Sequence, residues 1–180
     1  AVLHTAVRVG DEGIVMALVE AGAGVDAGNA KSETPAHVAL ASGQPSIAVA
    51  LVKAGADASL WDASGRSLVH VAAREGNLPV LSALNDEGSD MNVRTEAGET
   101  ALHFTVSQKD GAGTELLIKL GASINLQLQR SRATALHLAV KKNSVACVKA
   151  LLASPLCNVN LMDKEGRNPL AAAKKLKRKE

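Results

Sequence analysis

Five histidines are the side chains of this 180-residue sequence best suited to chemistry near neutral pH. An imidazole can act as a general acid or base, and several together can bind zinc. Catalytic or metal-binding histidines must meet at one site and have no reason to be evenly spaced. Successive histidines here are nevertheless separated by 33, 33, 33 and 34 residues, at His4, His37, His70, His103 and His137. The spacing therefore indicates a repeated structural unit.

A four-residue motif ending in histidine recurs at 34–37, 67–70, 100–103 and 134–137. Each copy opens with Thr or Ser, which favours a helix N-cap because the hydroxyl accepts a hydrogen bond from a free backbone N–H. Apolar helical stretches and single glycines follow each motif at regular distances, and glycine is typical of helix C-termini. The pattern predicts two short helices in every repeat. A sixth copy at 168–171 has Ala171 in place of histidine, and only a first helix follows it.

The period of 33 residues and the motif Thr-Pro-Ala-His resemble the ankyrin repeat. The resemblance covers nearly the whole chain. It implies an all-α fold, an ankyrin-repeat solenoid of stacked helix–turn–helix units with projecting β-hairpin loops. We expect a single domain over 1–180, and a fragment of a longer protein because no initiator methionine is present. The expected repeats are about 1–33, 34–66, 67–99, 100–133 (with one extra residue in 126–133), 134–167 and a partial 168–180.

The composition excludes several other classes of protein. Apolar residues make up 47% of the chain but aromatic residues only 1%, so Ala, Val and Leu must form thin layers between closely spaced helices. The sequence has no run of about 18 uncharged apolar residues, which predicts no transmembrane segment. Cys147 and Cys157 form no disulfide framework and suit a reducing compartment. We therefore expect an intracellular, cytoplasmic protein.

The sequence contains no motif of a known catalytic, metal or cofactor site. Gly111-Ala112-Gly113 has no preceding strand, so it predicts a weakened helix start and no phosphate site. We expect the histidines to bond to the backbone of their own or the next repeat. Copies about 10 Å apart, the packing distance of helices, cannot share a zinc ion at about 2 Å. The expected protein is not an enzyme and has no cofactor.

Charge is distributed unevenly along the chain. Residues 1–125 contain 8 basic and 15 acidic residues, whereas 126–180 contain 12 basic and 3 acidic ones. The basic end favours an acidic partner, while the run at 174–179 also fits a nuclear-import signal, an anionic membrane surface or a solvated helix end. A nucleic acid fits poorly, because almost no aromatic side chains can stack on bases and most of the chain is acidic.

The family resemblance also implies where a partner binds. Ankyrin ligands usually lie on the concave surface made by the hairpin tips and the exposed positions of the first helices, and these positions vary between the copies of this chain. Trp61, an aromatic residue that the repeat does not require, is either an interface anchor or a packing residue between loops. The predicted partner-binding residues are Trp61, Arg66, Arg74, Glu75, Glu99, Gln108, Arg130, Lys141, Lys142, Lys164 and Arg167.

The resemblance implies a non-catalytic protein–protein interaction module, a scaffold or adaptor, acting as a monomeric domain. Two alternatives stay open: a regulatory inhibitor that masks a partner such as a transcription factor, and the ankyrin region of a larger enzyme or channel. In the family, hairpin asparagines after a Leu-x5-Asp pattern can be hydroxylated. Leu84, Asp90 and Asn92 match this pattern, so we expect Asn92 to be a hydroxylation site.

Overall fold

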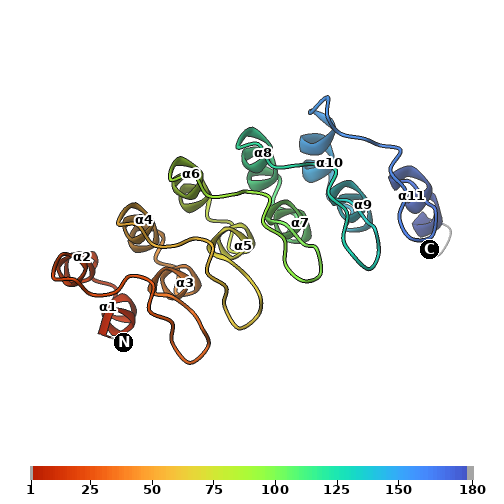
Figure 1. Ribbon diagram of the computed structural model, residues 1–180. Coiled ribbons are helices and arrows are strands. Elements are labelled where there is room, and N and C mark those ends of the chain that lie inside the picture. The colour runs from red at the N-terminus through yellow and green to blue at the C-terminus, as the bar shows by residue number, and fades with distance from the viewer. Residues whose placement is uncertain (1, 178–180) are drawn as a thin grey trace. The chain divides into compact units, whose positions relative to one another are not determined.

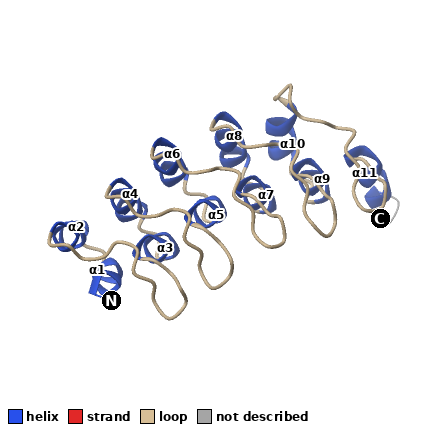
Figure 2. Cartoon of the chain, viewed as in Figure 1, coloured by secondary structure: helices blue, strands red, loops and turns tan. Residues whose placement is uncertain are grey.

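The computed structural model describes residues 2–177, in an N-terminal unit (residues 1–90) and a C-terminal unit (residues 91–180). Within 2–177 the secondary structure comprises eleven α-helices and no β-strand (Figure 2). The N-terminal unit contains α1 (Val2–Val9), α2 (Glu12–Glu20), α3 (Pro35–Ala41), α4 (Pro45–Lys53), α5 (Leu68–Arg74) and α6 (Leu78–Asp86). The C-terminal unit contains α7 (Ala101–Ser107), α8 (Gly111–Lys119), α9 (Ala135–Lys141), α10 (Val145–Leu152) and α11 (Pro169–Lys177).

The helices form pairs, and a long loop that projects away from the helices follows each pair (Figure 1). In the N-terminal unit the first helices α1, α3 and α5 pack on one another in order, and so do the second helices α2, α4 and α6. In the C-terminal unit α7, α9 and α11 form one layer, while α8 and α10 form the other. Each unit therefore confirms the predicted pattern of two helices per repeat, with α11 as the first helix of the partial repeat.

A threonine or serine caps four of the first helices, as predicted, and the histidine three positions later completes each cap. The backbone N–H of Thr34 donates to Nδ1 of His37 at 3.3 Å, while the Thr34 hydroxyl accepts from the backbone N–H of His37 at 3.4 Å. Thr100 donates in the same way to Nδ1 of His103 at 3.2 Å. This reciprocal capping box usually has Glu or Gln at the third position. The cap explains why histidine recurs with the repeat.

The second ring nitrogen ties the first helix of a repeat to the loop that closes the same repeat. Nε2 of His4 donates to the carbonyl oxygen of Glu33 at 2.8 Å, and Nε2 of His137 donates to that of Arg167 at 2.9 Å. Nδ1 of His137 accepts the backbone N–H of Thr134 at 3.2 Å, while Nε2 is the donor nitrogen of the ring. The expected bonding of histidine to backbone is confirmed within its own repeat.

Glycines follow four of the five second helices in residues 2–177, as predicted. Gly22 has a φ of 87° and the N–H of Ala23 donates back to the carbonyl of Leu18 at 2.9 Å, a left-handed turn that glycine adopts without steric cost. Lys109, which follows α7, has a φ of 61° at a position where other repeats use glycine. A side chain in this conformation costs free energy, because Cβ approaches the backbone.

Replacing Lys109 by glycine is expected to raise the free energy of unfolding by about 0.5–1 kcal/mol, because relief of left-handed strain outweighs the added freedom of the unfolded chain. Urea denaturation followed by circular dichroism measures this change. The matched control is Lys149→Gly in the interior of α10, which should lower the free energy of unfolding by about 1 kcal/mol. Equal losses in both variants would refute the strain at Lys109.

The projecting loops close as turns. The N–H of Asp163 donates to the carbonyl of Arg167 at 2.9 Å, whereas in the preceding loop Leu128 donates to Ala133 at 3.0 Å. The second bond spans one residue more, which confirms the extra residue expected in 126–133. Within 2–177 the hairpin loops form no strands. An isolated antiparallel bridge joins Gln127 and Thr134.

Neighbouring loops of the C-terminal unit are joined by single backbone hydrogen bonds. The N–H of Gln129 donates to the carbonyl of Ala97 at 3.0 Å. One repeat further on, the N–H of Lys164 donates to the carbonyl of Ser131 at 2.8 Å. The loops are thus aligned side by side.

The glycine-rich segment predicts a weakened helix start, yet α8 begins at Gly111 itself. Its N-cap is Asp110, whose carboxylate accepts the backbone N–H of Gly113 at 2.9 Å. A Cβ added at Gly111 would lie 2.6 Å from Cβ of Ala146 on α10. Glycine at this position therefore lets α8 and α10 pack at short distance.

Candidate functional site

Two predicted binding residues, Arg66 and Arg167, are held by an aspartate of their own loop. Nε and Nη2 of Arg167 donate to Oδ2 of Asp163 at 3.0 and 2.7 Å, and Arg66 binds Asp62 at the same two distances. The other carboxylate oxygen of Asp163 accepts the backbone N–H of Arg167 at 2.9 Å. Both aspartates are buried. Each pair therefore shapes its loop from within.

The electrostatics of these pairs follow from their geometry. Burial raises the pKa of Asp163, but the hydrogen bonds and the charge of Arg167 outweigh it and lower that pKa to about 2. Burial also raises the pKa of Asp62, but the bonds from Arg66 outweigh it, so that pKa is lowered as well. Arg167 also donates to Glu165 at 2.6 Å. Its guanidinium is thus engaged inside the loop, and a variant of Arg167 changes loop structure as well as surface charge.

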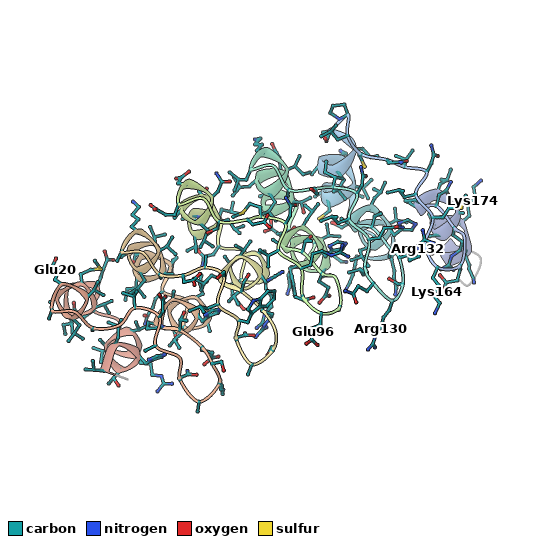
Figure 3. The ribbon with its side chains drawn as sticks, in the orientation of Figure 1. Glu20, Glu96, Arg130, Arg132, Lys164 and Lys174 are labelled. Carbon is teal, nitrogen blue, oxygen red and sulfur yellow. The ribbon has the colours of Figure 1, made fainter. Side chains whose placement is uncertain are left out.

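Other predicted residues of the C-terminal unit are not engaged in this way. Figure 3 shows Arg130 and Lys164 at the tips of successive loops. Lys141 and Lys142 lie at the C-terminal end of α9. All four side chains are exposed, and none forms an ion pair with a residue in 2–177. These cations are available to an anionic group outside the chain.

The remaining predicted residues offer less free charge. Arg74 and Glu75, at the end of α5, form an exposed ion pair at 3.1 Å, a contact of little energetic value in water. Gln108 is the exposed C-cap of α7, and Glu99 is half-buried at the end of its loop. Arg178 and Lys179 of the basic C-terminal run lie outside the described residues.

The structure brings Lys141 and Arg167 together at one groove of about 350 Å³ in the C-terminal unit. Lys175 of α11, absent from the residues predicted from the sequence, lines the same groove. Helices α9 and α11 pack side by side in successive repeats, so equivalent positions on them face the same space. Lys175 lies 34 residues after Lys141, one repeat period, and this spacing is the signal that would have found it.

Arg132 is a second basic residue missing from the predicted set. It comes from the same loop as Arg130 (Figure 3), and its backbone φ is 53°. The corresponding loops have glycine at this place, as at Gly65 and Gly166, each with a positive φ. An arginine in a conformation that favours glycine adds a further exposed cation to this face at a cost in backbone strain.

Trp61 lies in a loop of the N-terminal unit with 42% of its surface exposed. Its ring contacts the buried ring of His70, with 5.8 Å between centroids and 36° between planes. This contact joins the loop of one repeat to the first helix of the next, so the indole packs against the cap of α5. Its role as an interface anchor stays a prediction.

We expect Trp61→Ala to lower the free energy of unfolding by about 1–2 kcal/mol, because the ring contact and part of its buried area are lost. Trp61→Phe keeps an aromatic ring against His70 and should lose less than half as much. Thermal and urea unfolding measure both variants. An unchanged stability of Trp61→Ala would contradict the packing role.

Asn92, the predicted hydroxylation site, is half-buried and holds two repeats together. Its side-chain oxygen accepts the backbone N–H of Ser123 at 2.7 Å. One repeat further on, Asn125 accepts the N–H of Asn158 at 2.9 Å. The side chain therefore has a structural partner, and its hydroxylation stays a prediction.

Between residues 2 and 177, no three His, Cys, Asp or Glu side chains are grouped as metal ligands. Over the same range, none of the helices combines the length and apolar character needed to cross a membrane.

The repeat can be compared with known families. The family model described as ankyrin repeats (3 copies) matches at 44–128, 69–163 and 102–180, matches that overlap and together reach from 44 to 180. No curated protein matches the chain. Ankyrin repeats generally serve as protein–protein interaction modules and are typically non-catalytic. The matches cover more than half of the chain, and its helix pairs, capping motifs and loops fit the matched repeat. The chain therefore belongs to the ankyrin-repeat family.

Proposed function

We propose that residues 1–180 form one monomeric ankyrin-repeat domain, a scaffold or adaptor that binds a protein partner on the face made by its loops and first helices. The observation that carries this proposal is the contrast between two sets of positions. Residues that recur across the repeats, such as Thr100 and His103, are buried and bonded to one another. Residues that vary, such as Arg130 and Lys142, are exposed and unpaired within residues 2–177.

The partner is expected to be acidic where it meets the C-terminal unit. Arg130, Lys142 and Lys164 are exposed, come from successive loops and helix ends, and have no ion-pair partner within 2–177. Such cations raise the association rate of an acidic protein and favour it over a basic one. A reducing compartment suits the two free thiols, so we place the protein in the cytoplasm.

Charge reversal tests the proposal. The triple variant Arg130→Glu, Lys142→Glu, Lys164→Glu should lose at least tenfold of the affinity for proteins captured by the intact chain, because attraction becomes repulsion. The matched control reverses Lys53, Lys119 and Lys149, which are exposed on the second helices α4, α8 and α10. Quantitative mass spectrometry compares the captured proteins. If both variants capture equal amounts of partner, or lose it equally, binding on the face made by the loops and first helices is refuted.

A further inference from the structure

The groove of about 350 Å³ in the C-terminal unit has an apolar part and a charged part. Leu138 of α9, Ala172 of α11 and Ala133 of the preceding loop supply apolar surface. Its volume accommodates one or two side chains and not a folded element. The groove is therefore suited to one short stretch of an extended peptide.

The charges that line this groove do not cancel. Lys141, Lys175 and Arg167 are positive, while Asp163 and Glu165 are negative. Arg167 is bonded to both carboxylates, at 2.7 and 2.6 Å. Lys141 and Lys175 are exposed and have no ion-pair partner within 2–177. The net charge of the five side chains is therefore +1. Lys141 and Lys175 are the cations that no carboxylate of residues 2–177 engages.

We propose that this groove binds one Asp or Glu side chain of a partner peptide, with its carboxylate at Lys141 and Lys175. A neighbouring aliphatic residue of the peptide packs on Leu138 and Ala172. The inference rests on the proposed function and adds the chemical identity of the residue that enters the groove.

The charge balance favours a carboxylate over a phosphate. A single carboxylate neutralises the groove, whereas a phosphate with nearly two negative charges exceeds the available positive charge beside Glu165. The exposed Glu165 forms an ion pair with Arg167, and its carboxylate repels additional negative charge on this side of the groove. The apolar surface of Leu138 also suits the methylene groups of Glu more than a phosphate group.

The probe is a phage-displayed library of random twelve-residue peptides, selected on the intact chain. Enriched peptides should share an Asp or Glu beside an aliphatic residue. A synthetic peptide of that consensus should bind Lys141→Gln/Lys175→Gln about tenfold more weakly, measured by fluorescence anisotropy. The control Lys119→Gln/Lys149→Gln removes the same charge from α8 and α10 and should stay within twofold. Circular dichroism confirms that both variants are folded.

Several outcomes would overturn the inference. Enriched peptides without an acidic residue, equal weakening by both double variants, or no enriched peptide would each refute the carboxylate site. A phosphoserine in place of the acidic residue should bind more weakly, and tighter binding would assign the groove to phosphopeptides. The proposed function fails separately, since it depends on Arg130, Lys142 and Lys164 and on captured proteins. If the charge-reversal variant loses captured proteins but Lys141→Gln/Lys175→Gln does not weaken peptide binding, the carboxylate site is refuted and the proposed function is not.

Discussion

Lowering the pH from 7 to 4 is expected to reduce the free energy of unfolding by roughly 3 kcal/mol through His103 alone. Burial, with a contribution from the charge of Arg94, lowers the pKa of His103 to about 4, against 6.5 for a free imidazole. Between these values the unfolded chain binds a proton at this position and the folded chain does not. Stability therefore falls as the pH decreases from about 6.5 to 4 and is retained above 6.5.

Besides burial, which is the main cause of the lowered pKa, the helix cap also requires a neutral His103 ring. Nδ1 of His103 accepts the backbone N–H of Thr100, and a proton on Nδ1 would remove this acceptor. Burial lowers the pKa of His37 as well, so a second repeat contributes in the same direction. The loop carboxylates act in a different window: the pKa of Asp163 is about 2, so its contribution is lost below about pH 4.

Urea denaturation at pH 7, 6, 5 and 4 measures the effect, and NMR titration of the imidazole protons assigns it to His103. In His103→Gln the chain should be less stable at pH 7 but should lose roughly 3 kcal/mol less between pH 6.5 and 4. A His103 that titrates near 6.5 in the folded protein would disprove the explanation.

The second large effect is expected at Gly111. Gly111→Ala should lower the free energy of unfolding by about 1–3 kcal/mol, because overpacking forces two helices apart. The added Cβ would lie 2.6 Å from Cβ of Ala146 and 3.4 Å from its carbonyl carbon, and neither atom can move without α10. The intrinsic preference of alanine for helices opposes this loss but is smaller.

A double-mutant cycle isolates the contact. Ala146→Gly makes room for the new methyl group, so Gly111→Ala should cost at least 1 kcal/mol less in that background. Gly24→Ala is the control for glycine replacement, since a Cβ there meets no atom within 4 Å and its φ lies outside the left-handed region. Additive effects of the Gly111 and Ala146 changes would show that the two helices relax without strain.

Features set by contacts a few residues apart were predictable from the sequence. The cap at Thr100, the left-handed Gly22 and the helix pairs all depend on residues within one repeat. The pairing of Arg167 with Asp163 belongs to the same class, because Asp-x3-Arg also occurs at Asp62 and Arg66. This spacing indicates that both arginines also stabilise their own loops.

Features that depend on contacts between repeats were not predictable in the same way. Lys175 and Lys141 share a groove only because α11 packs beside α9 in register. The need for glycine at position 111 comes from Ala146, which lies on a different helix. A local reading of Gly111-Ala112-Gly113 therefore indicates a weak helix start, although the segment is a site of close packing.

The backbone hydrogen bonds between neighbouring loops make the docking of each loop separately observable. The amide protons of Gln129 and Lys164 are each held by one bond to the adjacent loop. Their exchange with solvent deuterium therefore reports the opening of one loop and not the unfolding of the whole chain. A partner that spans three loops slows both amides together, whereas a peptide seated in the Lys141 groove slows Lys164 alone. The exchange rates of these two amides therefore indicate how many repeats a bound partner covers.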